Sequence, residues 1–164
     1  MLMNLSGLRV IVIDDNRHAV EIIRSVLRAL GMRHVSHAVT EASGFRMHCL
    51  ENFDFAIIDQ NLGRGDEGLD LVRRLRTDPD SPNPFVPILM LTAYSERRRV
   101  LAARDSGITE FLVKPFTATE LARRLQSLLC RPRAFVRSGN YFGPDRRRLV
   151  NRRYDGPEQR RMTD

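Results

Sequence analysis

Three acidic residues that follow apolar runs are the residues in this sequence best suited to chemistry. Asp14 and Asp15 come directly after Leu8–Ile13, and Asp59 follows the apolar run 55–58. Short, unbroken apolar runs predict strands that are buried on both faces of a parallel sheet. The carboxyl ends of such strands form the edge at which open α/β sheets bind ligands. If the two strands are neighbours, the three carboxylates share one shallow pocket at that edge.

A cluster of three carboxylates needs a cation or a shared proton to be stable. Like charges about 4 Å apart repel each other by roughly 4 kcal/mol per pair at an effective dielectric constant of about 20. A ligand set made of oxygen atoms favours Mg²⁺, which keeps water ligands and readily shares its site with phosphate. These residues therefore predict a magnesium site suited to phosphate chemistry.

Strands and helices must alternate along the chain to position these residues. Apolar runs predict strands at 8–13, 35–39, 55–58, 85–91 and 109–113. Helical spacing and capping residues predict helices within 16–31, 40–50, 69–75, 95–107 and 117–130. Four prolines between Pro79 and Pro87 exclude a helix there and predict an exposed loop. Five β-α units in succession are typical of an α/β fold with a doubly wound, five-stranded parallel sheet.

The charge of the chain is unevenly distributed. Residues 1–130 carry 17 Lys and Arg against 16 acidic residues, whereas residues 131–164 carry 10 Arg against 4 acidic residues. We expect one domain over 1–130 and an irregular, arginine-rich extension over 131–164. The sequence has neither an apolar stretch of roughly 18 residues nor a signal segment, which favours a cytoplasmic protein without a membrane span.

Cysteines and histidines show no pattern of a metal or redox site. Cys49 and Cys130 are isolated, so we expect both to be reduced. The histidines are scattered, and we expect each to be a surface or partly buried residue without a chemical role: His18, His34, His37 and His48.

The polar residues at the ends of the expected strands follow a specific order. The acidic pair ends the first strand, Asp59 the third, Thr92 the fourth and Lys114 the fifth. This set resembles the receiver domain of two-component response regulators, a flavodoxin-like fold, over roughly residues 8 to 129. Several landmarks in the right order, each at the carboxyl end of a strand, carry the resemblance.

The resemblance implies a phosphoacceptor and not an enzyme with a separate substrate. Asp59 would accept a phosphoryl group from the phosphohistidine of a histidine kinase or phosphotransfer protein. Asp15, Asp59 and the carbonyl oxygen of Asn61 would hold Mg²⁺, and Asp14 would reach it through water. Little covalent work falls to the protein in such a transfer, because positioning and charge neutralisation supply most of the catalysis.

The resemblance also assigns the residues that read the phosphoryl group. Lys114, the only lysine in the chain, would neutralise phosphoryl oxygens, and a cis peptide bond to Pro115 would aim it inward. Thr92 would hydrogen-bond the phosphoryl group, and Phe111 would swing inward behind it. Phe111 lacks the hydroxyl of the more common tyrosine, which should alter the balance between the two states. The alternative is that Phe111 is an ordinary core residue.

The loop after the acceptor departs from the family pattern. Gly63 stands where a proline is usual, and Gly68 comes one residue later than the usual glycine. Gly65 could provide the turn for the extra residue, and we expect the loop to be more mobile than usual. Tyr94 is bulky enough to shade a phosphoryl group from water, or it faces solvent instead.

The extension contains a repeated motif. The sequence YFGPDRRR at 141–148 recurs as YDGPEQRR at 154–161. The motif residues are Tyr141, Gly143, Pro144, Arg146 and Arg147 in the first copy, and Tyr154, Gly156, Pro157, Arg160 and Arg161 in the second.

We expect the extension to dock as an ordered segment in a groove lined by acidic and apolar residues. That groove would belong to a downstream protein target or to a second copy of the chain in a homodimer, because the tyrosines and Gly-Pro turns offer buried surface at low entropic cost. The alternatives are a disordered tail without a role, or contact with nucleic acid or an anionic membrane through the arginines. The sequence thus favours a response regulator that switches protein contacts; a regulator with a nucleic-acid-binding tail is the main alternative.

Overall fold

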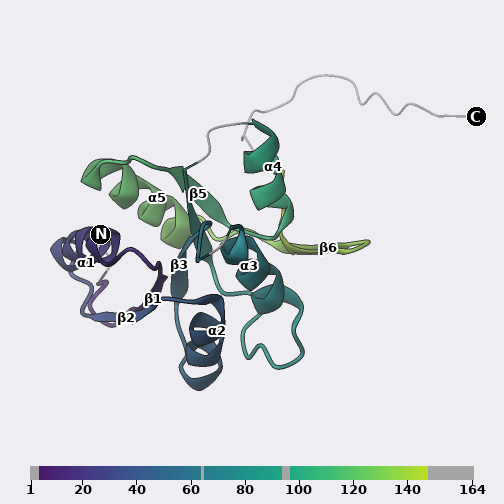
Figure 1. Ribbon diagram of the computed structural model, residues 1–164, viewed down its shortest axis with the longest axis horizontal. Helices are drawn as coiled ribbons and strands as arrows, with labels where there is room; N and C mark the ends of the chain where they lie inside the picture. Colours follow the sequence, from purple (N-terminus) through teal and green to yellow (C-terminus); the bar gives the residue numbers. More distant parts are fainter. Residues whose placement is uncertain (1–3, 64, 94–96, 148–164) are drawn as a thin grey trace, which may run out of the picture.

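The computed structural model describes residues 4–63, 65–93 and 97–147, except for the side chains of 97–99 (Figure 1). A five-stranded sheet has the strand order β2-β1-β3-β4-β5, and every neighbouring pair is parallel. The strands are β1 (Arg9–Ile13), β2 (His34–Ala38), β3 (Phe55–Asp59), β4 (Ile88–Thr92) and β5 (Glu110–Val113). The helices are α1 (Arg17–Ala29), α2 (Glu41–Leu50), α3 (Glu67–Thr77), α4 (Arg97–Asp105) and α5 (Ala118–Cys130). This confirms the doubly wound α/β fold.

Alternating residues of the central strands build one core on each face of the sheet. On one face, Val10 and Val12 pack with apolar residues of α1 and α5. On the other face, Ile11 and Ile13 pack with residues of α2 and α3. Because side chains of a strand alternate between faces, a continuous apolar run supplies both cores at once. The run before Asp59 is buried throughout for this reason.

The fourth strand begins later than the sequence indicates. We expected a strand over 85–91, but β4 begins at Ile88, and the ring of Phe85 is 54% exposed in the preceding loop. Pro87 lacks a backbone N–H, which accounts for the late start, because a central strand needs that donor. The loop places Phe85 against the extension.

The extension is not wholly irregular, which corrects the expectation for residues 135–144. These residues form an antiparallel hairpin of β6 (Phe135–Ser138) and β7 (Tyr141–Pro144), and Gly139 in its turn has a φ of +54°. The hairpin lies beside α3 and α4 in Figure 1. The second motif copy at 154–161 lies outside the described residues. The domain boundary expected at residue 130 stays a prediction, although side chains on both sides of it are in contact.

The exposure of the two cysteines and of His48 can be compared with the expectations from the sequence. Cys49 and Cys130 are both exposed, as expected for reduced residues. His48, expected at or near the surface, is 3% exposed in α2. Burial lowers the pKa of His48, and the positive charge of Arg76 lowers it further, while a backbone hydrogen bond to Asn83 opposes them. His48 follows the buried Phe45 by three residues in α2, so the helical period could have indicated its burial.

Candidate functional site

The three acidic residues meet at the carboxyl edge of the sheet. β1 and β3 are neighbours, with Ile13 level with Ile58, so the residues that follow these strands lie side by side. Carboxylate oxygens of Asp14, Asp15 and Asp59 all lie within 4.8 Å of one another. The pairing of β1 with β3, on which the expected pocket depended, is therefore confirmed.

The three carboxylates differ in burial and in hydrogen bonding. Asp14 is fully buried, and its Oδ1 accepts the backbone N–H of Asn16 at 2.8 Å. Asp59 is 6% exposed, and its Oδ1 accepts the backbone N–H of Asn61 at 3.2 Å. Asp15 is exposed, and its Oδ2 accepts the backbone N–H of Gly63 at 3.3 Å. Asp15 is thus the acid most open to an arriving cation, whereas Asp14 is held by the fold.

Lys114 brings the positive charge to this cluster from the end of β5. Its Nζ lies 3.1 Å from Oδ2 of Asp59 and 3.5 Å from Oδ2 of Asp14. The peptide bond between Lys114 and Pro115 is cis, as the resemblance implied. A compact ammonium on a flexible stem fits this crowded position better than a planar guanidinium.

Burial has the largest effect on the pKa of Asp59. Burial raises the pKa of Asp59 and the charge of Asp14 raises it further, while the Lys114 ammonium and the Asn61 N–H lower it. The net direction is upward, so protons compete with any cation at this carboxylate more than at an ordinary one. Three carboxylates beside one ammonium form an oxygen donor set that fits Mg²⁺.

The expected switch residues lie on adjacent strands. Thr92 is buried at the end of β4, one residue beyond the position level with Asp59. Phe111 is partly buried on β5 and packs against the core beneath α3, with the guanidinium of Arg124 5.7 Å from its ring centre. A half-buried aromatic at an edge strand has room to change rotamer, but its switching role stays a prediction. Tyr94 lies outside the described residues.

The loop after β3 is organised by Gln60 and Asp66, which the sequence did not single out, and by Gly68. Gln60 is buried, and its Nε2 donates to Oδ1 of Asp66 at 3.1 Å. Gly68, near the start of α3, donates its N–H to the carbonyl of Gln60 at 3.0 Å. A Cβ on Gly68 would lie 2.1 Å from the carbonyl oxygen of Asp59. The displaced glycine therefore still allows the helix to approach the acceptor closely; the expected mobility of the loop stays a prediction.

Comparison with known proteins places this site in a family. A family model for the response regulator receiver domain matches residues 10–126. The chain belongs to this family. It is 30% identical over 122 residues to chemotaxis protein CheY-3 of Vibrio cholerae serotype O1, covering 74% of this chain and 92% of that protein. It is 32% identical over 121 residues to chemotaxis protein CheY of Pseudomonas aeruginosa, covering 74% and 95%.

Solved structures agree with the family and extend to a metal-bound example. Vibrio cholerae CheY4 superposes with a TM-score of 0.66 at 27% identity, covering 74% of this chain and 98% of that one. The receiver domain of a Pseudomonas aeruginosa sensor histidine kinase, with a magnesium ion coordinated in its active-site cleft, has a TM-score of 0.65 at 28% identity. That match covers 74% of this receiver chain and 97% of the kinase receiver. The extension beyond residue 130 is outside the matched family model.

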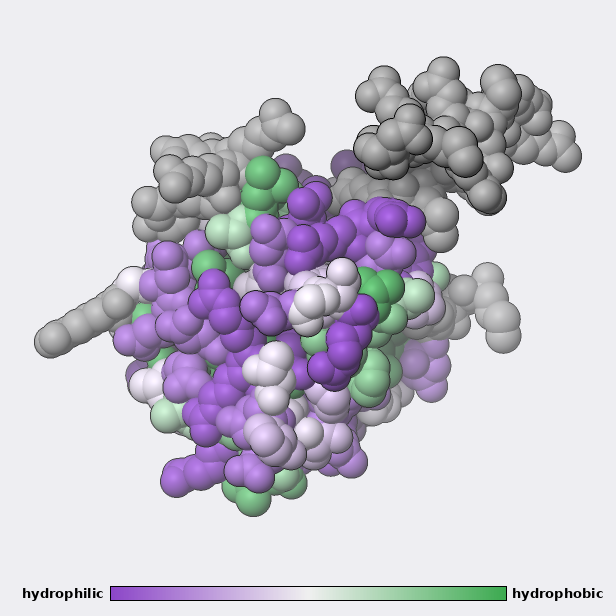
Figure 2. Space-filling model, turned by 90° about the vertical axis from the view of Figure 1, so that its right-hand side faces the viewer, coloured by the Kyte–Doolittle hydropathy of each residue, from purple (hydrophilic) through white to green (hydrophobic). Residues whose placement is uncertain are grey.

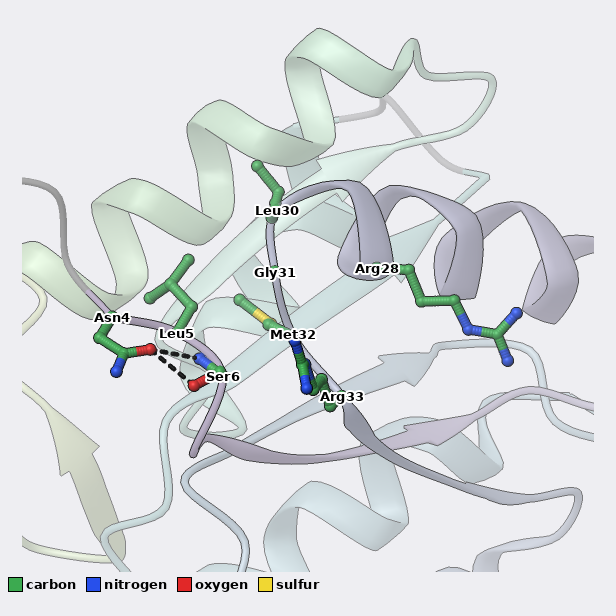
Figure 3. A pocket seen from close by; sticks show the side chains of 8 residues that line it. All are labelled: Asn4, Leu5, Ser6, Arg28, Leu30, Gly31, Met32 and Arg33. Atoms are coloured by element: carbon green, nitrogen blue, oxygen red, sulfur yellow. Dashed lines mark hydrogen bonds between the residues drawn. The ribbon is translucent and has the colours of Figure 1, made fainter.

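A hollow of about 680 Å³ lies between the segment 4–6 and the end of α1 (Figure 3). It is at the amino-terminal edge of the sheet, opposite the acidic cluster. The Oδ1 of Asn4 accepts hydrogen bonds from the backbone N–H and the hydroxyl of Ser6 there. None of the described residues that line the hollow is acidic. Within the described part of the chain, every helix is too short or too polar to cross a bilayer.

Proposed function

We propose that this receiver is a response regulator whose Asp59 accepts a phosphoryl group from the phosphohistidine of a histidine kinase or phosphotransfer protein. The observation that carries the proposal is the Asp59 carboxylate, which lies 3.1 Å from the Lys114 ammonium and within 4.8 Å of the acidic pair. Asp59 is accessible enough to react and buried enough for its neighbours to act in a low-dielectric setting. The site works on its own side chain, so the protein is a phosphoacceptor in the cytoplasm and not an enzyme with a separate substrate.

In the transfer, a carboxylate oxygen of Asp59 forms a bond to phosphorus while the phosphorus–nitrogen bond of phosphohistidine breaks. Asp15, Asp59 and the carbonyl oxygen of Asn61 would hold Mg²⁺, and Asp14 would reach it through water. A cation held there would neutralise charge on the phosphoryl oxygens. The Asn16 N–H fixes the Asp14 carboxylate beside these ligands.

Lys114 and Thr92 are the residues placed to act on the phosphoryl oxygens. The Lys114 ammonium, now bound to Asp59 and Asp14, neutralises one oxygen as charge develops in the transition state. The Thr92 hydroxyl, at the end of the strand next to Asp59, donates a hydrogen bond to another. Phe111 then turns inward, which changes the surface seen by a downstream protein target and switches protein–protein contacts.

Treatment with acetyl phosphate and Mg²⁺ tests this function. We expect mass spectrometry to detect one added phosphoryl group per chain, and peptide mapping to locate it on Asp59. The reaction should stop when the metal is removed with a chelator, because the uncompensated acidic pair then repels the donor. Phosphorylation at another residue, or none at all, would contradict the proposal.

The proposed metal ligands predict different effects of the two neighbouring acids. Asp15→Asn should weaken Mg²⁺ binding about tenfold or more, since it removes a direct, exposed ligand. Asp14→Asn should weaken it less, because Asp14 is proposed to reach the cation only through water. Titration calorimetry measures both affinities. Equal or reversed effects on Mg²⁺ affinity would show that the ligand roles are wrong.

A further inference from the structure

The hairpin of the extension covers an aromatic cluster and a buried arginine. Phe85 contacts Phe135 and Phe142 edge to face, with ring centres 5.1 and 5.4 Å apart. The side of the molecule at the right of Figure 1, where the hairpin lies, is mostly hydrophilic with small hydrophobic patches in Figure 2. The described part of the extension thus packs against its own receiver, whereas the sequence led us to expect docking on another molecule.

Beneath the cluster, Arg76 of α3 is 3% exposed and donates only to carbonyl oxygens among the described contacts. Its Nε donates to Gly107 at 3.0 Å, and its Nη1 donates to Val86 at 2.7 Å. The guanidinium lies 5.0 Å from the ring centre of Phe135. Burial lowers the pKa of Arg76 to about 9. The arginine therefore ties the connection between α4 and β5 to the loop that the hairpin covers.

The hairpin approaches that connection through backbone atoms. A Cβ on Gly143 would lie 2.9 Å from Cα of Gly107, and a Cβ on Gly107 would lie 3.1 Å from the carbonyl oxygen of Phe142. Arg146 adds an ion pair of 3.1 Å to Asp105, the last residue of α4. These backbone segments are in close van der Waals contact, so a shift of the α4–β5 connection by about 1 Å would disrupt their packing.

The first copy of the repeated motif contains two kinds of residue: some make contacts within the hairpin, and others contact the receiver. Within the first copy, the Tyr141 hydroxyl donates to the Pro144 carbonyl at 2.7 Å, and Asp145 accepts the N–H of Arg147 at 2.9 Å. The second copy retains a tyrosine, a proline and an acid at the matching positions. The docking residues of the first copy, Phe142 and Arg146, correspond to Asp155 and Gln159 in the second copy. Docking on this receiver is therefore built into the first copy specifically.

A second contact of the extension reaches the neighbour of the switch residue. Glu110 directly precedes Phe111, and its buried carboxylate binds Arg124 of α5 and Arg133 of the extension, each at 3.3 Å. Arg124 also lies 5.7 Å from the ring centre of Phe111. One guanidinium therefore contacts both the ring and the carboxylate that holds the extension.

We propose that the docked segment 133–146 is an intramolecular brace that favours the unphosphorylated receiver and is loosened when Asp59 is phosphorylated. The inference rests on the proposed function and adds its regulation. Inward rotation of Phe111 would take its ring away from Arg124, which shares the Glu110 carboxylate with Arg133, and would thereby disturb the contact that holds the extension. Because coupling between two sites is reciprocal, the same brace makes phosphorylation less favourable.

Hydrogen exchange on the full chain tests the brace, with beryllofluoride and Mg²⁺ as the phosphoryl mimic. We expect the amides of β6 and β7 to exchange about five- to tenfold faster once the mimic is bound. Fluorine NMR reports the bound mimic independently. Unchanged or slower exchange with the mimic bound would overturn the brace while leaving the proposed function intact. Failure of the mimic to bind would contradict the proposed function, and the brace with it.

Matched variants test the reciprocal effect. Arg133→Gln and Arg146→Gln together should raise the affinity for beryllofluoride by a similar factor, about five- to tenfold. Arg131→Gln with Arg147→Gln removes the same charge from exposed positions and should leave the affinity unchanged. A merely structural role would lower the free energy of unfolding without changing the affinity, and that result would also overturn the brace.

Discussion

Replacing Asp59 by asparagine should abolish phosphorylation by acetyl phosphate, because the amide oxygen lacks the charge needed to attack phosphorus. The substituted side chain has nearly the same size, so the buried end of β3 should keep its packing. We expect labelling to fall below detection by mass spectrometry, while circular dichroism stays unchanged. Labelling of the Asn variant at the wild-type level would show that the acceptor is a different residue.

The same substitution should not lower the free energy of unfolding of the metal-free protein at neutral pH. Burial raises the pKa of Asp59, so its charged form favours the unfolded chain. The folded wild type takes up its proton at a higher pH than the unfolded chain and gains stability as the pH falls through that raised pKa. The stability difference between wild type and variant should therefore shrink on acidification, which urea denaturation at several pH values measures.

Replacing Gly68 by alanine should damage both the fold and the reaction. The added Cβ would lie 2.1 Å from the Asp59 carbonyl oxygen and 2.8 Å from Cα of Gln60, and neither backbone atom can rotate away. We expect a loss of roughly 3 kcal/mol in the free energy of unfolding. Because the start of α3 and the end of β3 must separate, phosphorylation by acetyl phosphate should also slow, by about a hundredfold.

Gly7→Ala is the matched control for this substitution. Among the described residues other than its chain neighbours, none has a heavy atom within 4 Å of the position of a Cβ on Gly7, and its φ is not positive. The control should unfold in urea like the wild type and react at the same rate. If Gly68→Ala behaved like the control, the close approach of α3 to the acceptor would not be needed for function.

Local patterns in the sequence were sufficient to predict the sheet and most of the candidate site. The apolar runs before Asp14 and Asp59 determined where two strands end, and the order of Thr92 and Lys114 located two more strand ends. These predictions succeeded because parallel strands expose their carboxyl ends at one edge, so chain order alone brings such residues together.

Other features depended on contacts between distant segments. The expected start of the fourth strand at Phe85 was wrong: β4 begins after Pro87, and the ring of Phe85 packs against the hairpin instead. Gly68 looked misplaced in sequence, yet the extra residue before it is absorbed in the loop and the glycine still meets Asp59.

The sequence by itself determined which residues form the acidic site, because strand periodicity and polar strand ends are local properties of the chain. Only the tertiary structure decided that the extension folds back on its own receiver. An aromatic and arginine-rich segment can bind any surface of matching shape and charge, so its composition does not determine which surface it binds. The choice follows from Arg76, Asp105 and Glu110, which α3, α4 and β5 place on the side that the extension covers.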